Sequence, residues 1–114
     1  MDAAEAFEGR EGFRFVDVRQ EYEWNAGHVE GSAHITLQEL PARFTEIPKD
    51  KPVVFVCQIG QRSDLATRFL QDQGYEAYNL EGGLTMWAEQ GYPLLAGAGD
   101  SGAVIDGWAE DLTW

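Results

Sequence analysis

The sequence predicts an α/β fold, with a mostly parallel β-sheet and helices on both of its faces. Segments with the pattern of strands alternate with segments of helical pattern, which is the order of strand–helix–strand units around a parallel sheet. Residues 51–57 include a continuous apolar run, typical of a strand buried on both faces of such a sheet. A length of 114 residues is that of one domain with its own core. We therefore expect a single domain over residues 1–95.

The first third of the chain predicts a short helix and two strands. The helix is expected over residues 3–7. Residues 13–18 are aromatic and β-branched, which favours a strand. Gly27 and Gly31 flank a few apolar residues and predict a turn, followed by a short strand over residues 33–35.

A second helix is predicted after Thr36, which could cap it. Leu37, Leu40 and Phe44 have the spacing of one helical face. Pro41 fits best in the first turn, because proline lacks the amide hydrogen that a later position would donate.

The second half of the chain predicts two more helices with a strand between them. Ser63 can cap a helix that ends at Gly74, and residues 77–80 predict the strand. The last helix follows a turn at residues 81–83 and ends at Gly91. The apolar sides of the two helices are formed by Leu65, Ala66, Phe69 and Leu70, and by Leu84, Trp87 and Ala88.

Charge and composition limit the class of protein and its partners. A net charge of −12 repels polyanions, which argues against nucleic acids and anionic membranes as partners. No apolar run approaches the roughly 18 residues of a membrane span, and residues 1–8 are acidic, unlike a signal peptide. The single cysteine cannot form an internal disulfide. We expect a soluble, cytoplasmic protein that holds any bound anion with local N–H groups and arginine.

The loop after the central strand is the strongest candidate for a functional site, because ligands of parallel α/β sheets bind beyond the carboxyl ends of strands. Its backbone N–H groups can converge near the positive end of the next helix, and together with Arg62 they favour the nucleophilic thiolate form of Cys57. Gly60 allows the loop to curve with a positive φ. The alternative is a cysteine that only packs in the core, as free cysteines often do. The candidate residues are Cys57 as nucleophile and Gln58, Ile59, Gly60, Gln61, Arg62 and Ser63 as the substrate-binding loop.

This loop resembles the active loop of the rhodanese family, which follows the pattern C-x-x-G-x-R-S. Two further segments resemble signatures of the same family. The N-terminal signature comprises Asp17-Val18-Arg19, Glu23-Trp24 and Gly27-His28-Val29-Glu30-Gly31-Ser32-Ala33. The C-terminal signature comprises Leu80-Glu81-Gly82-Gly83, Trp87 and Gly91-Tyr92-Pro93-Leu94. Three motifs in this order, covering residues 7–95, are far more specific than one motif alone.

The resemblance implies a single rhodanese-like domain with a five-stranded, mainly parallel sheet, and an enzyme of the thiosulfate sulfurtransferase type. In such an enzyme Cys57 would take sulfane sulfur from thiosulfate or a persulfide donor, hold it as a persulfide, and pass it to a thiol or protein acceptor. No metal or organic cofactor is implied. The alternative is a non-catalytic rhodanese-like module for binding or for carrying sulfur.

The length and charge of the loop narrow this chemistry. Related phosphatases and arsenate reductases resemble C-x5-R, whereas four residues separate Cys57 from Arg62. The shorter loop makes a smaller cradle, which suits a sulfur atom better than a tetrahedral oxyanion, so these two activities are less favoured. Gln58, Ile59 and Gln61 are uncharged, where many thiosulfate-using relatives place a basic residue. This difference favours a persulfide donor over the thiosulfate dianion.

Several polar residues and glycines of the motifs have mainly structural interpretations. Asp17 and Arg19 either line the mouth of the pocket or pair as part of the scaffold that supports it. His28 could act as a general base, but its place in the N-terminal signature favours a structural role. Gly82 and Gly83 form a helix entry and could let their loop approach the site closely.

Residues 96–114 are expected to form an acidic tail beyond the domain. Its first part is rich in glycine and alanine, which is typical of a flexible joint. Trp108, Leu112 and Trp114 could pack as one apolar face against the domain or a partner, or the tail could stay flexible.

Overall fold

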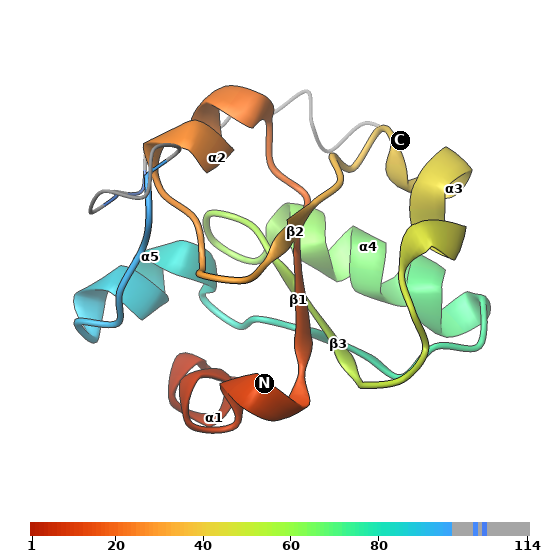
Figure 1. Cartoon of the computed structure of the whole chain (residues 1–114), viewed down its shortest axis with the longest axis horizontal. Helices are drawn as coiled ribbons and strands as arrows, with labels where there is room; N and C mark the ends of the chain where they lie inside the picture. The colour runs from red at the N-terminus through yellow and green to blue at the C-terminus, as the bar shows by residue number, and fades with distance from the viewer. Residues whose placement is uncertain (97–101, 103, 105–114) are drawn as a thin grey trace.

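The computed structural model describes residues 1–96, 102 and 104. Its sheet has four strands, all parallel, in the order β2-β1-β3-β4 (Figure 1). The strands are β1 (Arg14–Asp17), β2 (Ala33–His34), β3 (Val53–Val56) and β4 (Ala77–Asn79). The predicted α/β class with a parallel sheet is therefore confirmed.

The number of strands differs from the five that the family resemblance implied. In the part of the chain that the structure describes, Leu95 pairs with His28 as an isolated antiparallel bridge instead of forming a fifth strand. Each of these two residues donates its N–H to the carbonyl oxygen of the other at 2.8 Å. Pro93, two residues earlier, has no amide hydrogen with which to extend the pairing.

Helices cover both faces of the sheet, as expected. The helical elements are α1 (Ala3–Glu8), η1 (Arg10–Gly12), α2 (Glu21–Ala26), α3 (Leu40–Arg43), η2 (Phe44–Glu46), α4 (Gln61–Asp72) and α5 (Gly83–Glu89). The helices α1 and α5 lie on one side of the sheet, and α3 and α4 lie on the other (Figure 1). Apolar residues of α1 and α5 belong to one cluster with residues of β3, and those of α3 and α4 belong to a second cluster. The helix α2 lies near the end of the sheet at which the strands finish (Figure 1).

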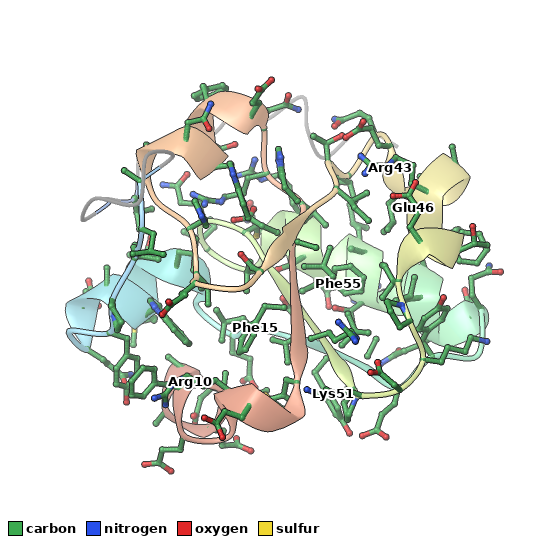
Figure 2. The ribbon with its side chains drawn as sticks, viewed as in Figure 1. Arg10, Phe15, Arg43, Glu46, Lys51 and Phe55 are labelled. Carbon is green, nitrogen blue, oxygen red and sulfur yellow. The ribbon has the colours of Figure 1, made fainter. Side chains whose placement is uncertain are left out.

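The strand β3 is the centre of the core, as its apolar run predicts. Its four residues are all fully buried. Val54 and Val56 belong to the cluster with α1 and α5, whereas Val53 and Phe55 belong to the cluster with α3 and α4. Phe15 of β1 lies in the first cluster, and Figure 2 shows it on the opposite side of the sheet from Phe55.

The helix predicted after Thr36 is present, although it is shorter than its apolar pattern. Pro41 lies in the first turn of α3, as predicted. Thr36 and Glu39 exchange backbone-to-side-chain hydrogen bonds in the turn just before α3, so Thr36 organises the approach to the helix while Glu39 occupies the N-cap position. The helix α2 was not predicted, because its single buried residue is Glu23 and it has no apolar face.

No helix in the described ranges is long and apolar enough to cross a lipid bilayer.

Two residues of the expected tail, Gly102 and Val104, are described by the structure. Gly102 donates its N–H to the carbonyl of Leu94 at 2.9 Å, and Val104 packs against the cluster that contains α1 and α5. The apolar residues on which the docking prediction depends, Trp108, Leu112 and Trp114, lie outside the described residues.

Candidate active site at the end of β3

Cys57 follows the last residue of β3, so its side chain stands at the carboxyl end of the central strand, with only 1% of the residue exposed. Three hydrogen-bonding groups of the following loop surround its sulfur. The N–H groups of Gly60 and Ser63 donate to Sγ at 3.1 and 3.4 Å, and the Ser63 hydroxyl lies 3.2 Å away. The predicted convergence of loop N–H groups on the cysteine sulfur is present in the structure.

Gly60 makes this convergence possible. Its φ is +101°, a left-handed conformation that glycine adopts without steric cost. Gly60 is also the N-cap of the 12-residue helix α4, which therefore begins at Gln61. Ser63 was predicted to cap this helix, and that prediction is wrong, because the turn at Gly60 starts the helix earlier. Ser63 instead lies within the first turn of α4, with its hydroxyl oxygen 3.2 Å from the cysteine sulfur.

Carbonyl groups of the same loop are held on its other side by α5. Leu84 and Thr85 donate their N–H groups to the carbonyl oxygens of Cys57 and Gln58, at 2.9 and 3.0 Å. Gly83 lies against this loop so closely that a Cβ there would stand 2.4 Å from the Gln58 carbonyl oxygen. The close approach expected for this glycine pair is confirmed at Gly83. Because α5 binds loop carbonyls, the opposite edge of the loop presents its amides to the sulfur.

Arg62, which the sequence assigns to the substrate-binding loop, forms a buried ion pair with a carboxylate of α2. Its guanidinium donates two hydrogen bonds, at 2.6 and 2.8 Å, to the carboxylate of Glu23 in α2. The Glu23 side chain is fully buried and that of Arg62 is 7% exposed. A buried carboxylate requires a charged partner, and Arg62 supplies it. Sequence reasoning missed Glu23 as a partner of the loop, although it appears in the N-terminal signature.

Asn79 is a second residue of the site that sequence reasoning missed. It is the last residue of β4, beside Phe55 of β3. Its Oδ1 accepts a hydrogen bond of 2.5 Å from the Ser63 hydroxyl, and its Nδ2 donates to the Gly60 carbonyl oxygen at 3.0 Å. The rule that sites form beyond the ends of neighbouring parallel strands could have identified it.

Asp17 and Arg19 form a buried ion pair, which agrees with the scaffold interpretation. The Arg19 guanidinium donates to the Asp17 carboxylate at 2.7–3.1 Å and to the carbonyl oxygen of Gly27 at 2.6 Å. Both side chains are fully buried. The pair therefore connects the end of β1 to the loop after α2, and it supports the site from within the fold.

His28 also has structural contacts, as expected. Its Nδ1 lies 2.9 Å from the carbonyl oxygen of Trp24, and its ring stacks on the Trp24 indole with centroids 3.7 Å apart. His34 is in β2, within the strand predicted over residues 33–35, with Nε2 at 2.7 Å from the Arg19 carbonyl oxygen. Both rings therefore already have partners in the scaffold.

The side chains of the remaining loop residues face outward or are partly covered. Ile59 is 51% exposed, and Gln61 is exposed as well. Gln58 lines a groove of about 700 Å³ that runs along α5 and also contacts Tyr92 and Leu94. This groove is the cavity that adjoins the Cys57 loop.

A slightly larger cavity, of about 790 Å³, lies away from Cys57, beside β1 and β2. Arg10, Phe15, Arg43, Glu46 and Lys51, which are labelled in Figure 2, are among its lining residues. Cys57 and the other loop residues are not part of its lining. The chemistry of the loop therefore does not extend to this cavity.

The comparisons with known proteins identify the family of the chain. A family model described as a rhodanese-like domain matches residues 2–90, which contain every residue of the site. This chain belongs to the rhodanese-like family.

Three relatives show how close the match is. A sulfurtransferase of Allochromatium vinosum is 39% identical over 85 residues, which are 74% of this chain and 79% of that protein. The thiosulfate sulfurtransferase GlpE of Tolumonas auensis is 36% identical over 82 residues, covering 71% of this chain and 76% of that protein. The crystal structure of a rhodanese-related protein from Thermoplasma volcanium superposes with a TM-score of 0.81 at 32% identity, covering 83% of this chain and 95% of that one. The rhodanese-like domains that this chain resembles therefore include proteins named as sulfurtransferases.

Proposed function

We propose that this rhodanese-like protein is a sulfurtransferase that carries sulfane sulfur on Cys57 as a persulfide. The sulfur comes from a persulfide donor or from thiosulfate and goes to a thiophilic acceptor, such as a small thiol or a protein thiol. The observation that carries the proposal is the arrangement around Sγ, where two backbone N–H groups and one hydroxyl lie within 3.4 Å. Relatives named sulfurtransferase support sulfur as the group transferred.

The reaction takes place in two displacement steps. The Cys57 thiolate attacks the outer sulfur of the donor, a new S–S bond forms, and the old S–S bond of the donor breaks. The leaving group departs with the bonding electron pair, as sulfite from thiosulfate or as a thiolate from a persulfide. The acceptor nucleophile then attacks the terminal sulfur of the Cys57 persulfide, and Cys57 leaves as the thiolate.

Backbone groups supply the stabilisation of negative charge in this scheme. The N–H groups of Gly60 and Ser63 already point at Sγ, so they require no rearrangement when charge develops there. The N-terminus of α4 adds its partial positive charge at the same place, because the loop leads directly into this helix. Arg62 contributes mainly by holding Glu23, and hence α2, against the loop.

The same geometry favours a persulfide as donor over thiosulfate. Residues 58–61 carry no charged side chain, and the Arg62 guanidinium makes two charge-assisted hydrogen bonds to Glu23. A dianion that approaches a protein of net charge −12 must therefore be bound mainly by backbone dipoles. The persulfide group carries one negative charge where thiosulfate carries two, so a small persulfide of net charge about −1 meets less repulsion.

The mass of the intact protein tests the proposal. Wild-type protein incubated with cysteine persulfide or with thiosulfate should gain one sulfur atom, and addition of a thiol acceptor should remove it. The chain has a single cysteine, so the adduct has one possible site, and Cys57→Ser should gain nothing. We expect a higher yield with the persulfide than with thiosulfate at equal concentration. If neither donor gives an adduct, the proposal is rejected.

A further inference from the structure

The hydroxyl of Ser63 stands between two atoms that both could take its hydrogen bond. On one side, Cys57 Sγ lies 3.2 Å from Ser63 Oγ. On the other side, Asn79 Oδ1 lies 2.5 Å from the same oxygen. The proposed sulfur transfer counts the hydroxyl among the groups around the sulfur but assigns no role to Asn79.

The hydrogen bonds of the Asn79 amide determine which way round it lies. Its nitrogen lies 3.0 Å from the Gly60 carbonyl oxygen, which can only accept, so the NH₂ group must point there. Oδ1 then faces Ser63, and because Oδ1 can only accept, the hydroxyl must donate its one proton to it. The Ser63 oxygen is left to accept from Cys57, which it can do only while Cys57 is a thiol.

Loss of the thiol proton changes this pattern. A thiolate has no proton to donate, so its 3.2 Å contact with Ser63 becomes favourable only if the hydroxyl turns to donate to sulfur. The turn breaks the hydrogen bond to Asn79. Formation of the thiolate therefore costs the hydrogen bond between Ser63 and Asn79. A residue without an acceptor at position 79 would not add this cost.

We propose that Asn79 is a positioning residue that withholds the Ser63 proton from Cys57, and thereby sets the pH at which the nucleophilic thiolate forms. This inference rests on the proposed function, since it concerns the same sulfur. In physical terms, the hydrogen bond to Asn79 must break before the hydroxyl can donate to sulfur, so this hydrogen bond opposes formation of the thiolate.

Charged groups around the loop cannot substitute for this effect, because they form ion pairs that a change at position 79 leaves in place. The pairs on the surrounding elements are Arg62 with Glu23, Arg19 with Asp17, Arg68 with Asp64, and the N-terminal amino group with Glu81.

The experiment is a titration of the thiolate by its ultraviolet absorbance, with Cys57→Ser subtracted as the baseline. Four proteins are compared: wild type, Asn79→Leu, Ser63→Ala and the double variant. Leucine has nearly the shape of asparagine and no acceptor, so Asn79→Leu should move the midpoint to lower pH by about 0.5 to 1 unit, the size of one neutral hydrogen bond. In the Ser63→Ala background the same substitution should leave the midpoint unchanged, because the hydroxyl is absent.

The comparison of backgrounds separates a proton-directing role from a merely structural one. Asn79→Leu also removes the hydrogen bond to the Gly60 carbonyl, and any effect of that loss should appear equally with and without the Ser63 hydroxyl. The inference would be overturned if Asn79→Leu shifted the titration midpoint equally with serine and with alanine at position 63. It would also be overturned if the midpoint did not move to lower pH with serine at position 63. If Asn79→Leu does not fold, Asn79→Ala lacks the same acceptor and is read in the same way.

This titration and the adduct experiment can fail independently. The titration reads the thiol alone and uses no sulfur donor, so it can support a role of Asn79 even in a protein that takes up no sulfur. Conversely, a sulfur adduct without any shift in the titration would keep the proposed function and reject the role of Asn79.

Discussion

Replacement of Glu23 by glutamine tests the buried ion pair that joins α2 to the start of α4. The substitution keeps the shape of the side chain but replaces the carboxylate that accepts two hydrogen bonds from Arg62. Both side chains are at most 7% exposed, so water cannot take over the interaction. Breaking a buried pair on one side typically costs about 3–5 kcal/mol. Glutamine retains one acceptor oxygen, which places the expected loss of unfolding free energy near 3 kcal/mol.

Thermal and urea unfolding measure this loss. A domain of this size loses about 4 °C in midpoint per kcal/mol, so Glu23→Gln should lower the midpoint by about 12 °C. Glu46→Gln is the matched control, because Glu46 also pairs with an arginine, Arg43, at 3.0 Å but is 55% exposed. Solvent screens such a pair, and its loss should be barely measurable.

A double variant identifies the cause of the loss. Glu23→Gln/Arg62→Gln removes both charges, so it should be less destabilised than the sum of the two single variants. The reasoning is refuted if Glu23→Gln costs no more than Glu46→Gln, or if the double variant shows the full sum.

Two further predictions concern the α5 contact and the acid sensitivity of the fold. Gly83→Ala should displace the Cys57 loop and strongly reduce sulfur uptake, because the new Cβ would stand 2.4 Å from the Gln58 carbonyl oxygen. Gly91→Ala is the control, because Gly91 has a similar positive φ but no atom within 4 Å of the new Cβ. This variant should lose only about 1 kcal/mol of unfolding free energy and keep its sulfur uptake. Hydrogen bonds from the hydroxyl and backbone N–H of Thr36 hold the pKa of Glu39 below its ordinary 4.5. The stabilisation that the ionised Glu39 gives to the folded state is therefore present above about pH 4.5. It is lost as the pH falls through the lower pKa that Glu39 has in the folded state. In urea titrations, wild type should exceed Glu39→Gln in stability at neutral pH, and the difference should vanish in acid; a constant difference would contradict this assignment.

The parts of the fold that could be predicted from the sequence are those with local signals. The apolar run at β3 predicts a strand buried on both faces because each of its residues must be covered by something apolar. The loop motif and Gly60 likewise predict amides that converge on Cys57, since a short turn into a helix leaves them no other direction.

The parts that could not be predicted depend on which elements meet in space. Arg62 and Glu23 are 39 residues apart, and no local rule indicates that the arginine of the loop is held by a carboxylate of α2. The misassigned cap at Ser63 has a similar origin, because serine before an apolar pattern resembles an N-cap until the conformation of Gly60 is known. Asn79 becomes part of the site only because β4 lies beside β3.

Burial of the cysteine sulfur determines which atom of the proposed persulfide an acceptor can reach. Cys57 is only 1% exposed, and the loop amides and the Ser63 hydroxyl surround the sulfur that would become the inner atom. In the proposed persulfide the added sulfur would stand about 2 Å, one S–S bond length, beyond it. Attack on the outer atom transfers sulfur, whereas attack on the inner atom would form a mixed disulfide and release sulfide. In the proposed mechanism the enclosure would therefore favour the productive outcome by steric means, and it would protect the protein from capture by the thiols proposed as its acceptors.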